Sequence, residues 1–591
     1  MTSVDSTSSK KDEDEEREIM HDDLAEDEEH EDVSSELDAA QQEYLAHNQQ
    51  LEELLSPMFL DEAVLYKLAR RFSTTYRNLA LTSDQQFLPT PVTQLPTGQE
   101  TGRYLAIDVG GSNLRVAFIE LLGEAVDSDV RPTDATERSR DTIRKAQRQR
   151  VKRTLERAWP IQEHLKMDKA EDLFSWIGDC IAEVVAESLS SDATKKDIPA
   201  ELDMGITFSF PIMQESLAEA TLMPMGKGFA ISSNLNLGNI LLNGYEKHTR
   251  RPDDEDEPST KRRKLFALPK LKIQAITNDT VATLASLAYK VKSLPNSRVA
   301  MGIIVGTGCN ATIPMKLSAL HESKAKSVNT MDPGAVETIV NTEWTISGAA
   351  PPLKELNVTT KWDVELDQAC ARPGFQPFEY MTGGRYIGEL IRLILFGLSH
   401  NNRRIIKTLP TCKPQSSDWR WDAQAAGAFR KIARAVQRRS AGLIAAAVVG
   451  LLACAREIEL KEDSNSSSPE NPASPQSNDD AITESAGAPD AAVASLNSAA
   501  VAANHAGQGH VVPVLDPTPI DWQSGPEELV VAYTGGIIQH YPQFKEMCQQ
   551  YIDRLIMRTG PQRGGKSVFL REASDGGVIG AGVLAGMVVR K

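Results

Sequence analysis

The sequence predicts an α/β protein with mixed sheets arranged in two lobes. Short apolar runs alternate with amphipathic stretches, which is the pattern of strands joined by helices. Two of these runs end in glycine-rich turns, near residues 110 and 307, and we expect one such turn in each lobe. The expected strands cover 104–109, 114–121, 204–210, 299–306 and 529–536. The expected helices cover 170–189, 279–291, 388–398 and 426–457.

The net charge of −18 is concentrated at one end of the 591-residue chain. Residues 1–40 carry 17 acidic and 3 basic residues, a net charge of −14, so the other 551 residues carry −4. A run such as residues 12–16 repels itself and buries no apolar surface, so we expect a disordered tail that serves solubility or protein interaction. The acidity argues against nucleic acid as an obligate partner without excluding it.

The six cysteines and the apolar runs indicate the class of protein. No C-x-x-C pair occurs, which argues against a disulfide framework or a zinc ribbon and fits a reducing compartment. No apolar h-region follows Met1 and the N-terminus is acidic, so we expect neither a secretory signal nor a transit peptide. The longest apolar run, 441–455, is shorter than the ~20 residues that span a bilayer. We therefore expect a soluble protein in which this run is a buried core helix.

Two segments interrupt the globular pattern by their composition. Residues 138–153 hold eight Lys or Arg in 16 positions, and we interpret them as an exposed basic helix, a second import element or a weak phosphate-binding arm. Residues 463–508 are rich in Ser, Ala, Asn and Pro and have no aromatic residue. That composition predicts a disordered insertion over about 463–511.

A third segment, RRPDDEDEPSTKRRK at 250–264, is similar to a bipartite nuclear import signal. Nine residues separate its two basic clusters, which are Arg250-Arg251 and Lys261-Arg262-Arg263-Lys264. Basic clusters are also common in solvated loops, so a plain exposed loop is the alternative. The acidic spacer would repel phosphates, which disfavours a nucleic-acid patch.

Two glycine turns are candidate phosphate sites. In the first, a β run ends at Asp108, and Gly110-Gly111-Ser112-Asn113 turns the chain into a second run that carries Arg115. In the second, Gly306-Thr307-Gly308 joins two further runs. Glycines let the backbone double back and direct successive N–H groups at an anion, although either turn alone is as compatible with an ordinary tight turn. Neither is a Walker P-loop, since no G-K-[ST] opens a helix.

Polar residues at strand ends form a second set of candidates. Asn278 and Asp279 follow a β run and open an amphipathic helix. Asp279 is therefore either a general base over a cleft or an N-cap, a role that is open to Thr280 as well. Comparable positions, at strand ends, between glycines or beside aromatic residues, are held by Ser209, Lys227, Glu343 and Glu379. Each of these, taken alone, is as typical of a surface residue as of a site.

Taken together and in this order, the motifs closely resemble the eukaryotic hexokinase family over about residues 50–460 and 515–590. The resemblance implies the actin-like (ribonuclease-H-like) two-lobed sugar kinase fold, with the sugar in an interlobe cleft and the nucleotide across it. The chain looks most like the atypical, regulatory hexokinase-like paralogues of fungi, since ordinary metabolic hexokinases lack its three insertions.

The resemblance and the composition together predict five segments. A disordered acidic tail over 1–45 precedes a helical segment over 46–85 that packs on the large lobe. The small lobe covers 86–278 and contains the two basic insertions, and the large lobe covers 279–575 and contains the disordered insertion. A C-terminal helix over 576–591 returns to the small lobe.

The resemblance also implies roles for the candidate residues. Asp279, Lys227 and Arg115 would form the catalytic group, in which Asp279 accepts the proton of the sugar 6-hydroxyl. The sugar would contact Ser209, Lys227, Asn278, Asp279, Glu343 and Glu379. The nucleotide would contact Asp108, Gly110, Gly111, Ser112, Asn113, Gly306, Thr307, Gly308, Gly535 and Gly576. Mg²⁺ would arrive with ATP and have no direct protein ligand, with Asp108 reaching it through water, and we expect no tightly bound metal or organic cofactor.

The nucleotide half departs most from the family pattern. Gly577 and Val578 stand where the family's D-G-S-G-x-G motif has Ser and Gly. We expect Val578 to direct a side chain to the place where backbone would otherwise approach the nucleotide. Thr534 stands in place of the usual Asp before Gly535.

The sugar half departs less. Gly226 replaces a threonine before Lys227, which removes one sugar contact. Thr345-Ile346-Ser347 replaces the G-x-F of the family's E-W-G-x-F motif, and we expect this change to displace the loop that carries Glu343.

Three functions fit these features. The leading hypothesis is a hexose-binding member with weak or no phosphoryl transfer that acts as a nuclear regulator of the carbon-source or starvation response. The alternatives are an active ATP-dependent hexokinase of glycolysis and a scaffold that binds neither ligand. The expected location is the nucleus with the cytoplasm, and the alternative is the cytoplasm alone. Expected partners are a hexose, ATP, a nuclear import carrier and regulatory proteins at the acidic tail, with no membrane and no sequence-specific nucleic acid.

Overall fold

The computed structural model describes residues 42, 45–46, 48–123, 150–167, 169–191, 199–223, 234–249, 267–291, 296–401, 423–461 and 527–589. Apart from Lys461, these residues belong to one compact unit, formed by Met1–Leu460 and Pro526–Lys591. Five predicted features lie wholly or mostly outside the described residues, namely most of the acidic tail, the basic insertion over 138–149, the import sequence at 250–264, Lys227 and the insertion over 463–511. The structure therefore bears on the two sheets, their helices and the site between them.

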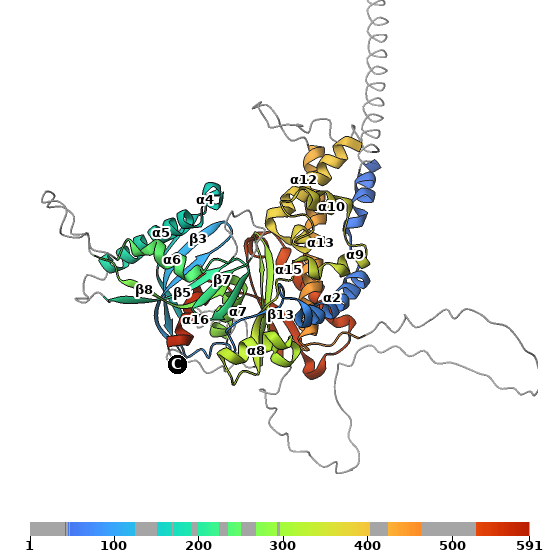
Figure 1. Cartoon of the computed structure of the whole chain (residues 1–591). Helices are drawn as coiled ribbons and strands as arrows, with labels where there is room; N and C mark the ends of the chain where they lie inside the picture. The colour runs from blue at the N-terminus through green and yellow to red at the C-terminus, as the bar shows by residue number, and fades with distance from the viewer. Residues whose placement is uncertain are drawn as a thin grey trace, which may run out of the picture. The chain divides into compact units, whose positions relative to one another are not determined.

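The first sheet has five strands in the order β4-β3-β2-β5-β8. They are β2 (Thr101–Val109), β3 (Asn113–Leu122), β4 (Val151–Pro160), β5 (Glu201–Phe208) and β8 (Lys270–Asn278). β2, β3 and β4 form an antiparallel meander, and β5 and β8 continue the sheet in parallel with β2. Helices α5 (Ala170–Ser191) and α6 (Leu237–Glu246) pack on one face (Figure 1). Alternate residues such as Val116 and Phe118 point into that face, as a strand period of two requires.

The second sheet has six strands in the order β1-β11-β10-β9-β12-β13. They are β1 (Leu88–Pro89), β9 (Ser297–Val305), β10 (Cys309–Lys316), β11 (Glu337–Asn341), β12 (Glu528–Thr534) and β13 (Ser567–Glu572). β9, β10, β11 and β1 pair antiparallel, whereas β12 pairs in parallel with both β9 and β13. A separate hairpin of β6 (Ile212–Ser216) and β7 (Glu219–Leu222) forms a two-stranded sheet.

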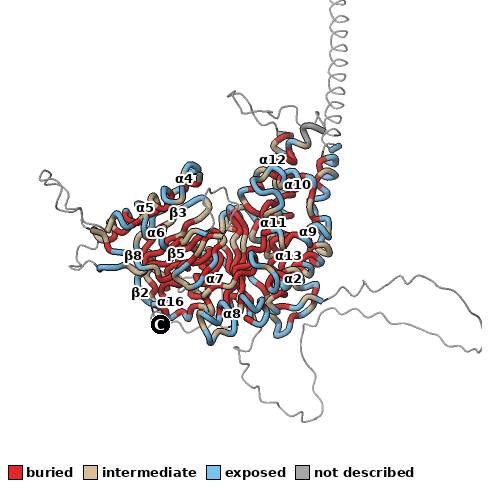
Figure 2. Tube along the Cα trace, in the orientation of Figure 1, coloured by how far each residue is buried: buried red, intermediate tan, exposed pale blue. Residues whose placement is uncertain are grey.

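Two helices lie between the sheets and join them. α7 (Asp279–Val291) packs on β9 and β12, and α16 (Gly576–Val589) packs on β2, β3, β5 and β8. The two helices contact each other closely, because a Cβ at Gly580 would lie 2.0 Å from the carbonyl oxygen of Ala282. The burial map shows this layer as continuously buried (Figure 2). Only glycine permits this backbone approach, so the helix pair fixes where the N-termini of α7 and α16 point.

The other face of the six-stranded sheet is covered by helices, of which α2 (Glu62–Thr82), α13 (Ala423–Cys454) and α15 (Phe544–Arg558) share one apolar core with it. A neighbouring core joins α13 to α10 (Lys361–Ala369) and α12 (Gly384–Asn401). Further α-helices in the described part of the chain are α4 (Glu163–Met167), α8 (Glu322–Met331), α9 (Pro351–Glu355), α11 (Pro377–Thr382) and α14 (Gly536–His540). By length and composition α13 could cross a membrane, but 89% of its most apolar window is buried in the protein. The prediction of a buried core helix over 441–455 is therefore confirmed.

The predicted strands and helices are present, and two predictions are corrected. Residues 150–153 are not part of an exposed basic helix, because Arg150 is buried and β4 begins at Val151. Gln42 and Leu45, which were expected in a disordered tail, are helical. The five cysteines in the described part of the chain are all free thiols, as their spacing predicted.

Candidate functional site

One cavity of about 580 Å³ lies between the two sheets, at the N-termini of α7 and α16. The predicted site residues that the structure describes all line it, and they are Asp108, Gly110, Gly111, Ser112, Asn113, Arg115, Ser209, Asn278, Asp279, Gly306, Thr307, Gly308, Glu343, Glu379, Gly535 and Gly576. These residues come from eight separate chain segments, so the fold alone brings them together. Lys227 and the predicted import residues lie outside the described part of the chain.

The two glycine turns face each other in this cavity. The β2–β3 turn is closed by a hydrogen bond of 2.9 Å from Gly110 N–H to the carbonyl of Asn113. The β9–β10 turn is closed in the same way, from Gly306 N–H to Gly308 at 2.9 Å. The hydroxyls of Ser112 and Thr307 lie 3.4 Å apart and connect the turns. The arrangement gathers backbone and hydroxyl donors from both sheets around one point, which suits an anion.

Asp108 lies beside these turns, opposite Arg115 in the β2–β3 ladder. Burial raises the pKa of its carboxyl from 3.8 to about 7, and the carboxylate of Asp279 adds to the rise while Arg115 opposes it. The carboxylate of Asp279 therefore acts on the ionisation of Asp108 within the cavity. Among the described residues no group of three or more His, Cys, Asp or Glu could hold a metal ion. Asp108 belongs to no such group and lies beside backbone N–H and hydroxyl donors, which fits a cation that arrives bound to phosphates better than a resident one.

Asn278 and Asp279 stand at the junction of β8 and α7. The amide oxygen of Asn278 accepts hydrogen bonds from the backbone N–H of Thr280 at 2.9 Å and from its hydroxyl at 2.5 Å. Asn278 therefore makes the capping contact for the first turn of α7. Its amide nitrogen donates to the carbonyl of Phe210 at 3.3 Å, and the carboxylate of Asp279 lines the cavity. The capping contact seen in the structure is thus made by Asn278, and Asp279 lies in the wall of the cavity.

Glu343 is held in place by amide groups although its loop departs from the family pattern. The side-chain amides of Asn341 and Asn310 donate to one of its carboxylate oxygens, at 2.9 and 3.1 Å. Gln86 donates to its backbone carbonyl at 2.9 Å, and the residue has a positive φ of 47°. The expectation that the changed residues 345–347 displace Glu343 is not met, since its carboxylate lines the cavity.

Glu379 and Ser209 line the same cavity as Glu343. Glu379 is 2% exposed, and its carboxylate accepts the backbone N–H of Cys309 at 3.0 Å. The glutamate therefore ties α11 to the β9–β10 turn. Ser209 follows β5, and its backbone N–H donates to the carbonyl of Val109 at 3.0 Å.

The N-terminus of α16 also borders the cavity. Gly576 and Gly577 line it, and the carbonyl of Gly577 accepts the hydroxyl of Thr207 at 2.9 Å. Val578 is fully buried in the apolar core between the sheets, with Val281 and Leu284 among its members. The prediction that Val578 directs a side chain at the nucleotide was wrong. Position 578 lies on the inward side of α16, a helical phase that the sequence motif does not reveal.

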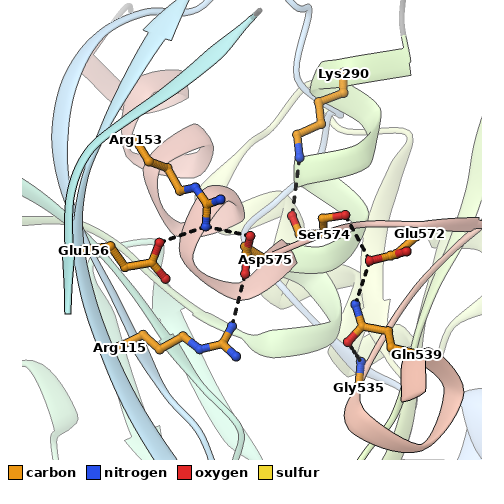
Figure 3. A network of polar contacts seen from close by, with 9 residues as sticks. All are labelled: Arg115, Arg153, Glu156, Lys290, Gly535, Gln539, Glu572, Ser574 and Asp575. Carbon is orange, nitrogen blue, oxygen red and sulfur yellow. Dashed lines mark hydrogen bonds and ion pairs between the residues drawn. The ribbon is translucent and has the colours of Figure 1, made fainter. Parts of the chain in front are cut away.

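A network of polar side chains holds the turn that precedes α16 (Figure 3). Asp575 accepts hydrogen bonds from Arg153 at 2.7 Å and from Arg115 at 3.4 Å. Glu572 accepts from Ser574 at 3.0 Å and from Gln539 at 3.1 Å. Gln539 in turn accepts the backbone N–H of Gly535 at 3.3 Å, so β12 and the turn are connected.

Sequence reasoning missed several residues of the site. Those with side chains at the cavity include Phe210, Asn310, Gln376, Gln539, Glu572, Ser574 and Asp575. Asn310 and Phe210 are direct neighbours of the motif residues Cys309 and Ser209, so the motifs themselves carried a signal for them. Gln539 and Glu572 belong to no motif that we identified, and only the parallel pairing of β12 with β13 brings them together.

Comparisons with known proteins agree with this geometry. Two hexokinase family models match the chain, one over residues 50–289 and the other over 300–417 and 489–587. Hexokinase-1 of Schizosaccharomyces pombe is 29% identical over 355 residues, which are 59% of this chain and 60% of that protein. The hexokinase of Kluyveromyces lactis is 30% identical over 311 residues, which are 53% of each chain. The chain thus matches less than two thirds of the length of these relatives.

A solved structure of a hexokinase from Schistosoma mansoni in complex with glucose is similar in fold. Its TM-score is 0.61 at 20% identity, and the match covers 92% of this chain and 99% of that one. A second hexokinase crystal structure gives a TM-score of 0.55 at 21% identity. These likenesses confirm the predicted two-lobed sugar kinase fold. The two family models together match most of the chain, over both of its sheets and the residues that line the cavity, and the protein belongs to the hexokinase family.

Proposed function

We propose that the protein binds a hexose in the cavity and transfers the γ-phosphoryl group of ATP to its 6-hydroxyl, slowly compared with a metabolic hexokinase. The observation that carries the proposal is that Asn278, Asp279, Glu343, Glu379 and Ser209, which come from five separate chain elements, all line one cavity. Carboxylates and amides pair with the vicinal hydroxyls of a sugar, and a site built to pair with hydroxyls rejects analogues that lack them.

Asp279 is the proposed general base. It lies at the N-terminus of α7, where a carboxylate is favourably placed, and it faces the cavity beside Asn278. In this role it takes the proton of the sugar hydroxyl as that oxygen attacks phosphorus. By resemblance Lys227 would contact the sugar from the segment that the structure does not describe.

The part of the cavity beside the two glycine turns suits the polyphosphate of ATP. The glycine turns at 110 and 306 offer backbone N–H groups, and Arg115 offers a fixed positive charge. Mg²⁺ bound to ATP supplies charge neutralisation at the phosphates. Asp108 stands two residues before Gly110 of the first glycine turn and lines the same cavity, so we assign it to the water shell of that ion.

Two features support slow transfer. Arg115 contacts Asp575 at 3.4 Å, so an incoming phosphate competes with a carboxylate for the guanidinium. Gly536 and Gly577 at the nucleotide end offer no side-chain hydroxyl, and Thr534 offers no carboxylate. Each missing contact reduces the stabilisation of the transferring phosphoryl group.

A coupled assay with glucose and MgATP, together with calorimetry of glucose binding, tests the proposal. We expect sugar binding in the wild type and turnover below the ~1–100 per second typical of kinases. Asp279→Ala should reduce turnover by about 100-fold or more if Asp279 is the base. Turnover in the usual kinase range would reject slow transfer. Sugar binding without turnover would reject phosphoryl transfer and favour a sugar sensor. Binding of neither ligand would reject both functions and favour a scaffold.

A nuclear regulatory role is a separate proposal that rests on the sequence at 250–264. Replacing Lys261, Arg262, Arg263 and Lys264 with alanine should move a tagged protein from the nucleus to the cytoplasm. An unchanged distribution of the variant would reject the import signal.

A further inference from the structure

We propose that Arg153 is a positioning residue that holds Asp575 and so leaves Arg115 available for the phosphates of a nucleoside triphosphate. The inference rests on the proposed function in one respect, since it takes Arg115 as a phosphate ligand. Arg153 itself does not line the cavity, whereas Arg115 and Asp575 do. Its effect on the ligand therefore passes through Asp575.

A β-bulge directs Arg153 toward Asp575. Along the β3–β4 ladder, Phe118 pairs with Leu155 but Ile119 pairs with Arg153, so Thr154 is the extra residue. Ile119 faces α16 and Phe118 faces α5, and paired residues share a face of the sheet. Without the bulge, position 153 would face α5. Bulges next to active sites commonly redirect a side chain in this way.

The rest of β4 shows the effect of the bulge on its charged residues. Arg157, beyond the bulge, faces α5 and pairs with Glu183 and Glu187 of that helix. Glu156 shares the α16 face with Arg153 and accepts a hydrogen bond from it at 2.8 Å. One strand thus carries two arginines of similar exposure, 42% and 43%, on opposite faces of the sheet. Of these two arginines of β4, it is Arg153 that contacts Asp575 in the turn before α16, whereas Arg157 contacts α5.

The contacts of Asp575 are unequal. Its carboxylate lies 2.7 Å from Arg153 and 3.4 Å from Arg115, at opposite oxygens (Figure 3). The backbone at Asp575 has a positive φ of 54°, and its carbonyl accepts the N–H of Ile579 in the first turn of α16. The carboxylate therefore projects from a fixed point between two guanidinium groups. The carboxylate of Asp575 offsets mainly the charge of the arginine that it contacts more closely. While Arg153 is that arginine, more of the charge of Arg115 stays available.

The turn that carries Asp575 is also held from the other side. Ser574 donates to Glu572, which is bonded to Gln539 of α14, and Lys290 of α7 approaches the carbonyl of Ser574 at 3.4 Å. These contacts restrict movement of the turn, so loss of Arg153 shifts the side chain of Asp575 rather than the backbone. The nearest remaining guanidinium is that of Arg115. In the absence of Arg153 we therefore expect Asp575 to pair fully with Arg115 and to compete with phosphate.

Calorimetric titration with ATP and Mg²⁺ in the presence of saturating glucose tests this role, using the full chain. We expect Arg153→Ala to raise the Kd for ATP up to about fivefold, the upper end of the range for one exposed charge contact, with the glucose Kd unchanged. Adding Asp575→Asn to that variant should bring the ATP Kd back to within about twofold of the wild type, because the competing charge is gone. Arg153→Lys should lie between the wild type and the alanine variant. Arg157→Ala is the matched control and should leave the ATP Kd unchanged.

The outcomes separate this inference from the proposed function. An ATP Kd that stays weak in the double variant would mean that Arg153 contacts the phosphates itself, which overturns the positioning role. An unchanged Kd in Arg153→Ala, or no ATP binding by the wild type, would overturn it as well. If ATP binds and the double variant is rescued while glucose is never phosphorylated, the inference stands and the proposed transfer fails.

Discussion

The carboxylate of Asp108 occupies the space that a side chain at position 577 would need. A Cβ built on Gly577 would lie 2.6 Å from the carboxyl carbon of Asp108, which is closer than van der Waals contact allows. The glycine at 577, where the family motif has serine, is thus matched to the position of Asp108. The departure from the motif is part of the local packing at the N-terminus of α16 and is more than the loss of a hydroxyl.

We therefore predict that Gly577→Ser does not restore kinase activity. Asp108 must rotate out of its position to admit the side chain, and overpacking of this kind costs about 1–3 kcal/mol. Thermal melts should show a lower midpoint, and turnover in the coupled assay should fall or stay the same. Gly388→Ser on α12 is the control, because nothing lies within 4 Å of a Cβ there and its midpoint should not fall. Faster turnover of Gly577→Ser would contradict the matched packing.

The second prediction concerns Asp108 and pH. Burial and the neighbouring Asp279 raise the pKa of Asp108 from 3.8 to about 7, so the folded state binds this proton more tightly than the unfolded state. The contribution to the free energy of unfolding is therefore fully present below about pH 4 and is lost as the pH rises through about 7. Asp108→Asn removes the ionisation.

Urea unfolding of the wild type and Asp108→Asn at pH 5 and pH 8 measures this effect. The variant should gain stability relative to the wild type as the pH rises from about 5 to 8, because its buried group never becomes charged. A difference between the two proteins that is the same at both pH values would show that Asp108 titrates normally. Comparing the two proteins at each pH cancels the contribution of the other titrating groups.

The sequence predicts elements whose pattern is local and misses those defined by their neighbours. The strands near 104–109 and 299–306 are apolar almost throughout because both faces are covered, and such runs are visible in one sequence. β4 is an edge strand with mostly exposed charged residues, so its first three residues, 151–153, resemble a continuation of the basic stretch that begins at 138. The bulge at Thr154 leaves no local signature.

The same distinction holds within the site. Asp279 and the glycine turns were found because a polar residue or a glycine directly after a strand stands out from its surroundings. The role of Asn341 was not found, because Asn341 lies within β11 and acts on Glu343 through its side chain alone. The direction of Val578 depends on how α16 is rotated between the sheets, which the packing of Gly580 on α7 determines.

The third prediction follows from the two amides that hold Glu343. Asn341 is 2% exposed and supplies one of two donors to the same carboxylate oxygen. In Asn341→Ala that carboxylate oxygen loses one of these two amide donors, so its orientation toward a sugar is less restricted. We expect the glucose Kd to rise by about 5- to 30-fold, the equivalent of about 1–2 kcal/mol, with the ATP Kd unchanged.

Calorimetry at a temperature below the melting transition of the variant checks the third prediction. Asn239→Ala, at an exposed position of α6, is the control and should bind glucose as the wild type does. Loss of both ligands in Asn341→Ala would indicate general damage to the cavity and would remove Glu343 as the specific cause.

The fourth prediction concerns the buried ion pair between Asp363 of α10 and Arg439 of α13. The two side chains are 2% and 0% exposed and meet through two hydrogen bonds of 2.6 and 2.7 Å. The carboxylate also accepts the backbone N–H and the hydroxyl of Thr360 at the start of α10. Asp363→Ala leaves a guanidinium without its counter-ion in the core, so we expect a loss of about 3–5 kcal/mol in the free energy of unfolding.

Desolvation of the pair offsets much of its attraction, so removing both charges should be far less harmful than removing one. We expect Asp363→Leu combined with Arg439→Met to recover most of the stability that Asp363→Ala loses, measured by urea unfolding of all three variants. The exposed pair of Arg392 and Glu389 has similar two-point geometry on α12, and Arg392→Met should change stability by less than about 0.5 kcal/mol. A double variant as unstable as Asp363→Ala would show that the ion pair is itself favourable, and that α10 depends on it for more than the neutralisation of a buried charge.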